Sequence, residues 1–210
     1  MIEYPQIMAS SKAPRKLCIG FEKLDGSNIR VKYTAKRGFE LFGSRTQLID
    51  STHPFLSEVI PIFMQQFSEP LTKIMKDEFR NEREAVVFGE FFGAKSFAGV
   101  HELNDPKQFV MFDIMVGHKQ PKFMLPQEFV KMFEGKVKIP RVMYRGNLND
   151  QLISDVRSGK YDVFEGLLCK GTERSGAFRG NVWMAKIKTQ KYFDALRARY
   201  GEEGVTKYGE

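Results

Sequence analysis

Short runs in which apolar residues alternate with polar ones recur along this 210-residue chain and predict strands. Residues 17–23 (LCIGFEK) and 28–34 (NIRVKYT) have this pattern. They are separated by Leu-Asp-Gly-Ser, a sequence typical of a tight turn. The sequence therefore predicts a hairpin near the N-terminus. Further strands are expected at 39–44, 85–92, 108–115, 162–169 and 181–188, with an extended run at 137–144.

Apolar residues with helical spacing occur between these strands. Two segments, 54–67 and 70–81, have this spacing and carry proline near their starts, where proline is best tolerated. Residues 147–159 begin with asparagine and end with glycine, as a capped helix does. Shorter helices are expected at 126–134 and 189–200, and the polar tail beyond them is expected to fray.

The order of these elements favours an α+β fold with antiparallel or mixed sheets flanked by helices. The helices fall between hairpins, whereas a doubly wound sheet alternates single strands with helices. No internal repeat, low-complexity tract or linker divides the sequence. We therefore expect one domain over residues 1–210, in which 189–210 form a C-terminal helix and tail.

The composition is that of a globular protein with a moderate basic excess. The chain has 33 Lys and Arg against 26 Asp and Glu, a net charge of +7 and a pI near 9.3. This excess permits binding to a polyanion such as nucleic acid but does not require it. No apolar run is long enough to cross a bilayer, and the N-terminus lacks the apolar core of a signal peptide. We therefore expect a cytoplasmic protein with no membrane partner.

The cysteines and histidines do not form a metal-binding pattern. Cys18 and Cys169 lie in apolar runs and are expected to be buried free thiols, as is usual in the cytosol. His53, His101 and His118 are scattered along the chain. A histidine zinc site is therefore not expected.

Lys23 stands at the end of the first predicted strand, directly before the Asp-Gly turn. A side chain in this place is held in position and can point its amine into a pocket. A free lysine amine has a pKa of about 10.4 and is a poor nucleophile at neutral pH, but burial and neighbouring cations lower that value. Taken alone, the pattern is more often a hairpin with an exposed lysine.

Other basic residues can supply such a field. Lys186 and Lys188 are two residues apart in a predicted strand, so they point to the same face of it. With Arg30 and Arg45 they would also neutralise a triphosphate. The alternative for the Lys-x-Lys pair is an alternating, solvated strand face, which is the commoner reason for this pattern.

Two glutamates lie beside glycines inside apolar strands, Glu90 in VVFGEFF and Glu165 in FEGLLC. A carboxylate in such a run is rarely left unpaired. Each glutamate therefore either forms a salt bridge with a lysine or contacts a ligand, and Mg²⁺ prefers oxygen ligands of this kind.

Six segments, in order along the chain, resemble the signature motifs of the covalent nucleotidyltransferase superfamily. This superfamily includes ATP-dependent DNA ligases, RNA ligases and mRNA capping enzymes. The details are most similar to RNA ligases of the nick-sealing and editing type, because Glu22 precedes the lysine and Asn28 follows it by five residues. Asp25 stands where that group often carries histidine, and aspartate there is shared by DNA ligases and capping enzymes. The six segments are Lys23-Leu24-Asp25-Gly26, Ser44-Arg45, Phe88-Gly89-Glu90, Phe112-Asp113-Ile114, Glu165-Gly166 and Lys186-Ile187-Lys188.

The resemblance implies an ATP-grasp-like nucleotidyltransferase fold that uses ATP with Mg²⁺ or Mn²⁺. Lys23 would attack the α-phosphate of ATP, release pyrophosphate and carry the AMP. The AMP would then pass to a 5′-phosphate end, and a 3′-hydroxyl would displace it to seal the strand. Lys186 and Lys188 would be catalytic cations, and Glu165 with Asp113 would bind the metal. The nucleotide contacts implied are Glu22, Asn28, Arg30, Arg45, Glu90 at the ribose, Phe112 stacked on the base, Glu165 and Lys170.

An ATP-dependent RNA ligase acting on nicked duplexes or RNA ends is therefore the leading hypothesis. A minimal ATP-dependent DNA ligase shares the motifs, but such ligases usually append an oligonucleotide-binding barrel. The 22 residues from 189 to 210 are too few for one. A non-catalytic nucleic-acid-binding module is the alternative from another class, and the presence of every expected reactive residue argues against it. Related ligases carry a second domain that clamps the nucleic acid, so we expect a partner chain to supply it here.

Overall fold

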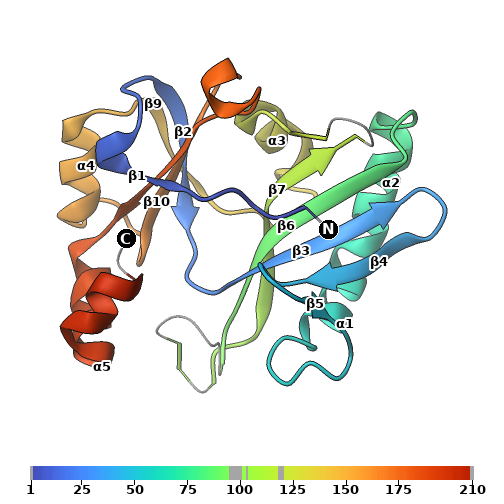
Figure 1. Cartoon of the computed structure of the whole chain (residues 1–210), viewed down its shortest axis with the longest axis horizontal. Coiled ribbons are helices and arrows are strands. Elements are labelled where there is room, and N and C mark those ends of the chain that lie inside the picture. Colours follow the sequence, from blue (N-terminus) through green and yellow to red (C-terminus); the bar gives the residue numbers. More distant parts are fainter. Residues whose placement is uncertain (1, 95–100, 103, 118–120, 209–210) are drawn as a thin grey trace. The chain divides into compact units, whose positions relative to one another are not determined.

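The computed structural model describes residues 2–94, 101–102, 104–117 and 121–208, which form two compact units (Figure 1). Each is named here after its sheet. The six-stranded unit comprises Met1–Pro5, Asp25–Met124 and Glu128–Ile139, and the five-stranded unit comprises Gln6–Leu24, Leu125–Gln127 and Pro140–Glu210.

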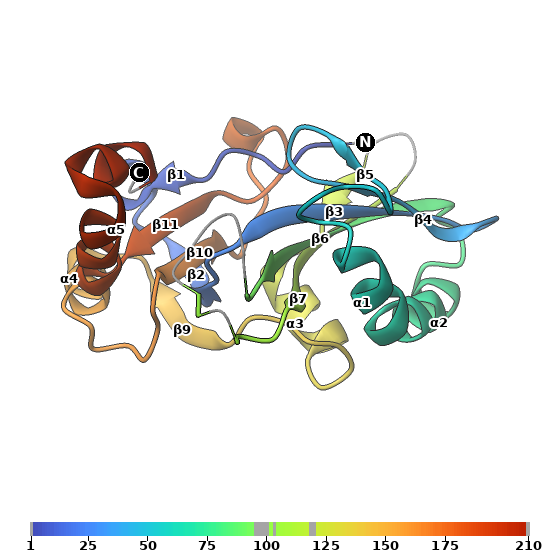
Figure 2. The ribbon, with the colours of Figure 1, turned by 90° about the horizontal axis from the view of Figure 1, so that it is seen from below.

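The six-stranded unit contains an antiparallel sheet with the strand order β5-β4-β3-β6-β7-β8. Helices α1 and α2 pack together against this sheet, as Figure 2 shows. Phenylalanine rings fill the space between them, and Phe63 of α1 is in ring contact with Phe39, Phe42 and Phe109 from the sheet. The elements are β3 (Ser27–Thr34), β4 (Gly38–Gly43), β5 (Leu48–Ile49), α1 (Val59–Gln66), α2 (Ser68–Glu78), β6 (Glu84–Phe92), β7 (Gln108–Val116) and β8 (Lys122–Phe123).

The five-stranded unit contains a mixed sheet with the order β1-β11-β10-β2-β9, in which only the β1–β11 pair is parallel. Helix α4 packs on β10 and β11. Its apolar side forms the core with alternate residues of the central strands, including Cys18 and Cys169. The elements are β1 (Met8–Ala9), η1 (Ser10–Lys12), β2 (Leu17–Lys23), β9 (Val142–Asn147), α4 (Asp150–Arg157), β10 (Gly166–Gly171), η2 (Gly176–Phe178), β11 (Met184–Lys188) and α5 (Gln190–Tyr208). Helix α3 (Pro126–Phe133) lies in the chain between β8 and β9.

The mixed α+β architecture confirms the predicted fold class. Strand β2 matches its predicted bounds, and an asparagine side chain caps α4, although the cap is Asn149 and not Asn147, with which the predicted segment begins. Both cysteines are buried, as expected. In the described part of the chain no helix has the length and apolarity needed to span a membrane. That residues 1–210 work as one adenylation domain stays a prediction.

Two expectations for local structure were wrong, while the run expected to be extended at 137–144 contains the start of strand β9 at Val142. The strand expected from 162 starts only at Gly166, because the chain bends around 161–165, where the N–H of Val163 donates to the carbonyl of Tyr161. The tail expected to fray is helical to Tyr208 after a kink at Gly201, whose φ of 69° is easy for glycine.

Candidate active site

Lys23, the last residue of β2, lies in an ion cluster centred on Glu165. The Nζ of Lys23 donates to Oε2 of Glu165 at 2.8 Å. The Nζ of Lys188, at the end of β11, lies 3.3 Å from Oε1 of the same carboxylate. This carboxylate bridges the two lysines. Because only 3% of the Glu165 side chain is exposed, solvent screens the attraction between these charges little. Both ion-pair partners therefore interact more strongly than a surface pair.

Strand register brings the cluster together. Gly166 of β10 pairs with Lys23 on one side and with Lys188 on the other. Directly paired residues of antiparallel strands point to the same face, so the two lysines flank Gly166 on one face of the sheet. A Cβ at position 166 would lie 1.9 Å from the carbonyl oxygen of Ile187, and φ there is +149°. Only glycine fits this position.

Lys186 and Lys170 project from the same face of the sheet. Lys186 pairs with Leu168, and Lys170 follows Leu168 by two residues in β10. Lys170 is buried and its Nζ lies 5.3 Å from the ring centre of Phe21. The predicted lysines therefore share one sheet face in the five-stranded unit.

Burial and the charges on this face of the sheet change the pKa of Lys188. Burial lowers the pKa of Lys188, and the charges of Lys23 and Lys186 lower it further. The carboxylate of Glu165 acts in the opposite direction. A concentration of positive charge of this kind attracts polyphosphate.

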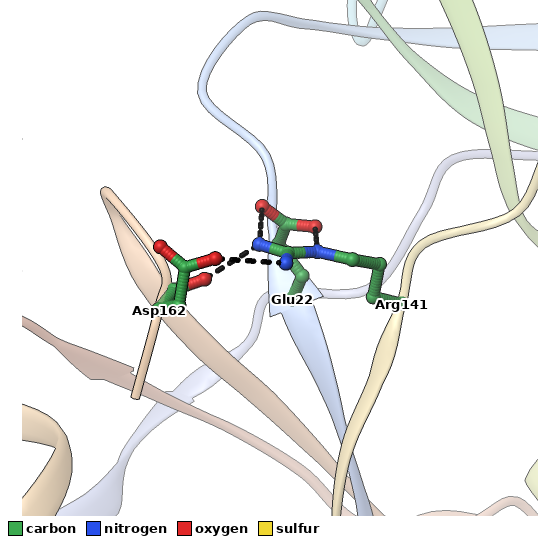
Figure 3. A network of polar contacts seen from close by, with 3 residues as sticks. All are labelled: Glu22, Arg141 and Asp162. Carbon is green, nitrogen blue, oxygen red and sulfur yellow. Dashed lines mark hydrogen bonds and ion pairs between the residues drawn. The ribbon is translucent and has the colours of Figure 1, made fainter. Parts of the chain in front are cut away.

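Glu22 points to the opposite face of β2 and is bonded to Arg141 (Figure 3). The guanidinium donates to both carboxylate oxygens, with Nε–Oε2 at 2.7 Å and Nη2–Oε1 at 3.1 Å. It also donates to the side chain of Asp162 at 3.1 Å and to its carbonyl oxygen at 2.5 Å. The backbone N–H of Glu22 donates in turn to the carbonyl of Arg141. These bonds to Glu22, and then to Asp162, raise the pKa of Arg141 above its usual range.

Sequence reasoning missed Arg141 and Asp162. Arg141 is 119 positions from Glu22 in sequence, and no local pattern marks either residue. Their effect is to tie the end of β2, just before Lys23, to the segment that leads into Glu165. Glu22 is thereby a member of a structural network, and its expected role at the nucleotide stays a prediction.

In the six-stranded unit, Asn28 of β3 pairs directly with Glu90 of β6. The two side chains therefore lie next to each other on one sheet face, and Arg30 follows on the same face two residues along. Oδ1 of Asn28 is buried and has no hydrogen-bond partner among the described residues. A buried acceptor without a partner is uncommon and is often satisfied by a ligand or water.

The pair Phe112–Asp113 is held by Tyr4, which sequence reasoning also missed. The hydroxyl of Tyr4 donates to Oδ2 of Asp113 at 2.9 Å, and the N–H of Ile114 contacts Oδ1. The Tyr4 ring lies edge-on to Phe112, with 5.0 Å between ring centroids. Burial, and then the Asp113 charge, raises the pKa of Tyr4 well above its usual value. Asp113 is thus engaged by the protein, and its expected contact with a metal stays a prediction.

Arg45 lies in a tight turn between β4 and β5. The N–H of Ser44 donates to the carbonyl of Gln47, and the N–H of Gln47 donates to the Ser44 hydroxyl. Arg45 itself is exposed. Its expected phosphate contact also stays a prediction.

The fold is the nucleotidyltransferase fold found in RNA ligases. The structure of Naegleria gruberi RNA ligase with pyrophosphate matches with a TM-score of 0.66 at 17% identity, over 95% of this chain and 59% of that one. A variant of the same ligase with AMP and manganese matches with a TM-score of 0.66 at 15% identity, over 93% and 58%. The chain thus spans less than two thirds of the length of these solved structures.

The sequence matches the family described as RNA ligase over residues 17–188. This match covers most of the chain and includes the ion cluster. The protein therefore belongs to the RNA ligase family. A search of curated proteins finds no match.

Proposed function

We propose that this chain is an ATP-dependent RNA ligase that forms a covalent lysine–AMP intermediate on Lys23. The observation that carries the proposal is the buried carboxylate of Glu165 between Lys23 and Lys188, inside the region that matches the family. The step forms a bond between Nζ of Lys23 and the α-phosphorus of ATP. It breaks the bond between the α- and β-phosphates, and pyrophosphate leaves.

Lys23 must lose a proton to solvent and leave Glu165 before it attacks. In the present arrangement the carboxylate favours the ammonium form, since an opposite charge within contact distance stabilises a cation. The pairing keeps the amine in place and unreactive until the nucleotide binds. Lys186 and Lys188 then supply positive charge to the phosphates, and such fixed charges are the main contribution to catalysis of phosphoryl transfer.

Glu165 fits a divalent ion that is bound mainly through the nucleotide. Mg²⁺ is commonly held by one or two carboxylates with substrate phosphates and water, and Mn²⁺ accepts similar ligands. No cluster of three or more metal-binding side chains occurs among the described residues, which fits this mode better than an all-protein site. When bound, the ion would neutralise phosphate charge. Solved relatives contain ATP or AMP with manganese.

Nucleotide recognition is proposed for the six-stranded unit. The Oδ1 of Asn28, which has no partner in the described part of the chain, and the adjacent Glu90 are suited to the hydroxyl and amine donors of a nucleoside. Phe112, supported by Tyr4, would stack on the base. Contacts with phosphates are proposed for Arg30, Arg45 and Lys170, as the resemblance implies.

The proposed substrate is RNA with a 5′-phosphate and an adjacent 3′-hydroxyl, as in a nicked duplex. Family membership supports RNA, and the net charge of +7 suits a polyanion. A further domain or partner chain that clamps the duplex is part of the proposal. It is tested by comparing a nick that is already adenylated, without ATP, with an ordinary nick and ATP.

The test of the function uses radiolabelled ATP or GTP, a divalent ion and matched nicked RNA and DNA duplexes. We expect label from ATP alone to stay on the denatured protein and RNA nicks to be sealed in preference to DNA nicks. Label from GTP would indicate a capping-type enzyme, and preference for DNA nicks a DNA ligase. Lack of any covalent label from either nucleotide would contradict the proposal.

A further inference from the structure

Thr189 follows Lys188 directly and is nearly inaccessible, with 1% of its surface exposed. Its backbone N–H donates to the carbonyl of Glu165 at 2.9 Å. Its hydroxyl donates to the carbonyl of Phe164 at 2.6 Å and accepts from the N–H of Tyr192 at 3.0 Å. One side chain thus joins the end of β11, the segment before β10 and the first turn of α5.

The two hydroxyl bonds have different consequences. The bond from Tyr192 is an N-cap, which satisfies a free N–H at the start of α5. The bond to Phe164 does not involve the helix. It fixes the backbone beside Glu165, and the backbone bond of Thr189 fixes Glu165 itself. Lys188 directly precedes Thr189, so the bonds of Thr189 also hold the backbone of Lys188 in place.

Resting on the proposed function, we propose that Thr189 is a positioning residue for self-adenylation. Its hydroxyl fixes the backbone at Phe164. The carboxylate of the next residue, Glu165, is thereby kept in contact with both Lys23 and Lys188. Without the hydroxyl bond, Phe164 is no longer tied to Thr189, and the backbone bond from Thr189 to the carbonyl of Glu165 alone holds residues 164–165, because they lie outside the β10 ladder, which begins at Gly166. The distances of the Glu165 carboxylate to the two amines then vary.

The chain contains a matched control for the helix cap. Asn149 caps α4 in the same unit, accepting from the N–H of Leu152 at 2.7 Å. Loss of its side chain removes one N-cap and touches nothing in the ion cluster. Thr189→Val keeps the shape of threonine and loses the hydroxyl, and Thr189→Ser keeps the hydroxyl.

The experiment measures single-turnover self-adenylation at varied ATP concentrations, together with thermal unfolding, for wild type, Thr189→Val, Thr189→Ser and Asn149→Ala. We expect Thr189→Val and Asn149→Ala both to lower Tm. Only Thr189→Val should reduce the adenylation rate at saturating ATP, by about 10- to 100-fold, because small misplacements of catalytic groups are costly. Its half-saturating ATP concentration should change little, and Thr189→Ser should restore the rate. A Thr189→Val rate equal to that of Asn149→Ala would overturn the inference.

A second readout does not depend on ligase activity. The rate at which a small acylating reagent modifies Lys23 is measured by peptide mass spectrometry on the same proteins without ATP. Looser placement of Glu165 should raise this rate severalfold in Thr189→Val and leave it unchanged in Asn149→Ala. If wild type takes no label from ATP but Lys23 acylation responds in this way, the proposed function fails, and Thr189 still positions Glu165 against Lys23. Equal acylation in both variants overturns the positioning role.

Discussion

The two units carry their candidate site residues in opposite ways. On the five-stranded sheet the charged groups are already engaged with one another, since Glu165 bridges Lys23 and Lys188. On the six-stranded sheet Asn28 and Glu90 are cross-strand neighbours, and the buried Oδ1 of Asn28 has no partner among the described residues. From this difference we infer that the charged groups proposed to react are held by partners in the free protein. An amide proposed to recognise the nucleotide keeps an acceptor available for it.

The largest effect is expected from the carboxylate at the centre of the ion cluster. Glu165→Gln keeps the shape of the side chain and removes the charge that Lys23 and Lys188 share. Self-adenylation should fall by about 100-fold or more, as is typical when a charge-stabilising group is lost. Single-turnover labelling measures this. Asp150→Asn, an exposed acid-to-amide change in the same unit, should label like wild type, and equal rates for the two variants would contradict the assigned role of Glu165.

A smaller effect of a different kind is expected on the other sheet. Asn28→Ala removes an amide whose oxygen has no partner among the described residues, so the free energy of unfolding should change by less than about 0.5 kcal/mol. The half-saturating ATP concentration should rise by about tenfold, the loss expected for one good hydrogen bond to a ligand. Denaturant unfolding and the ATP dependence of labelling are the measurements. A destabilised protein with an unchanged ATP dependence would mean that Asn28 is structural.

The smallest effect is expected from Arg141. Half of its side chain and nearly all of Asp162 (97%) are exposed, so solvent weakens the network. Arg141→Ala should reduce stability by about 1 kcal/mol or less and self-adenylation by about threefold. The control is Arg145→Ala, an exposed arginine of β9. A loss of activity as large as that of Glu165→Gln would show that the Glu22 network acts directly in catalysis.

The parts of the molecule that sequence could predict are those determined locally. Strand β2 was predicted to the residue because alternation and the Asp-Gly turn are both contained within a few positions. An asparagine cap for α4 was expected for the same reason, although Asn149 fills this position and not Asn147. The lysines of β11 were placed on one face by the period of a strand alone.

What sequence could not predict depends on contacts between distant residues. The strand expected from 162 begins late because the chain bends around 161–165, and the contacts of this segment are with Thr189, more than 20 positions away. Arg141 and Tyr4 hold candidate site residues more than 100 positions away, and no pattern near them reveals it. The pairing of Lys23 with Glu165 was one of two alternatives for a buried glutamate, and only the fold shows which lysines it meets.

The central claim is that Lys23, among the lysines on this sheet face, carries the AMP. The direct measurement is peptide mass spectrometry of the protein after reaction with ATP and Mg²⁺, which locates the added AMP. The account predicts modification of Lys23 alone in wild type and none in Lys23→Arg. AMP on Lys170, Lys186 or Lys188 of the wild-type protein, or an adduct that persists in Lys23→Arg, would contradict it.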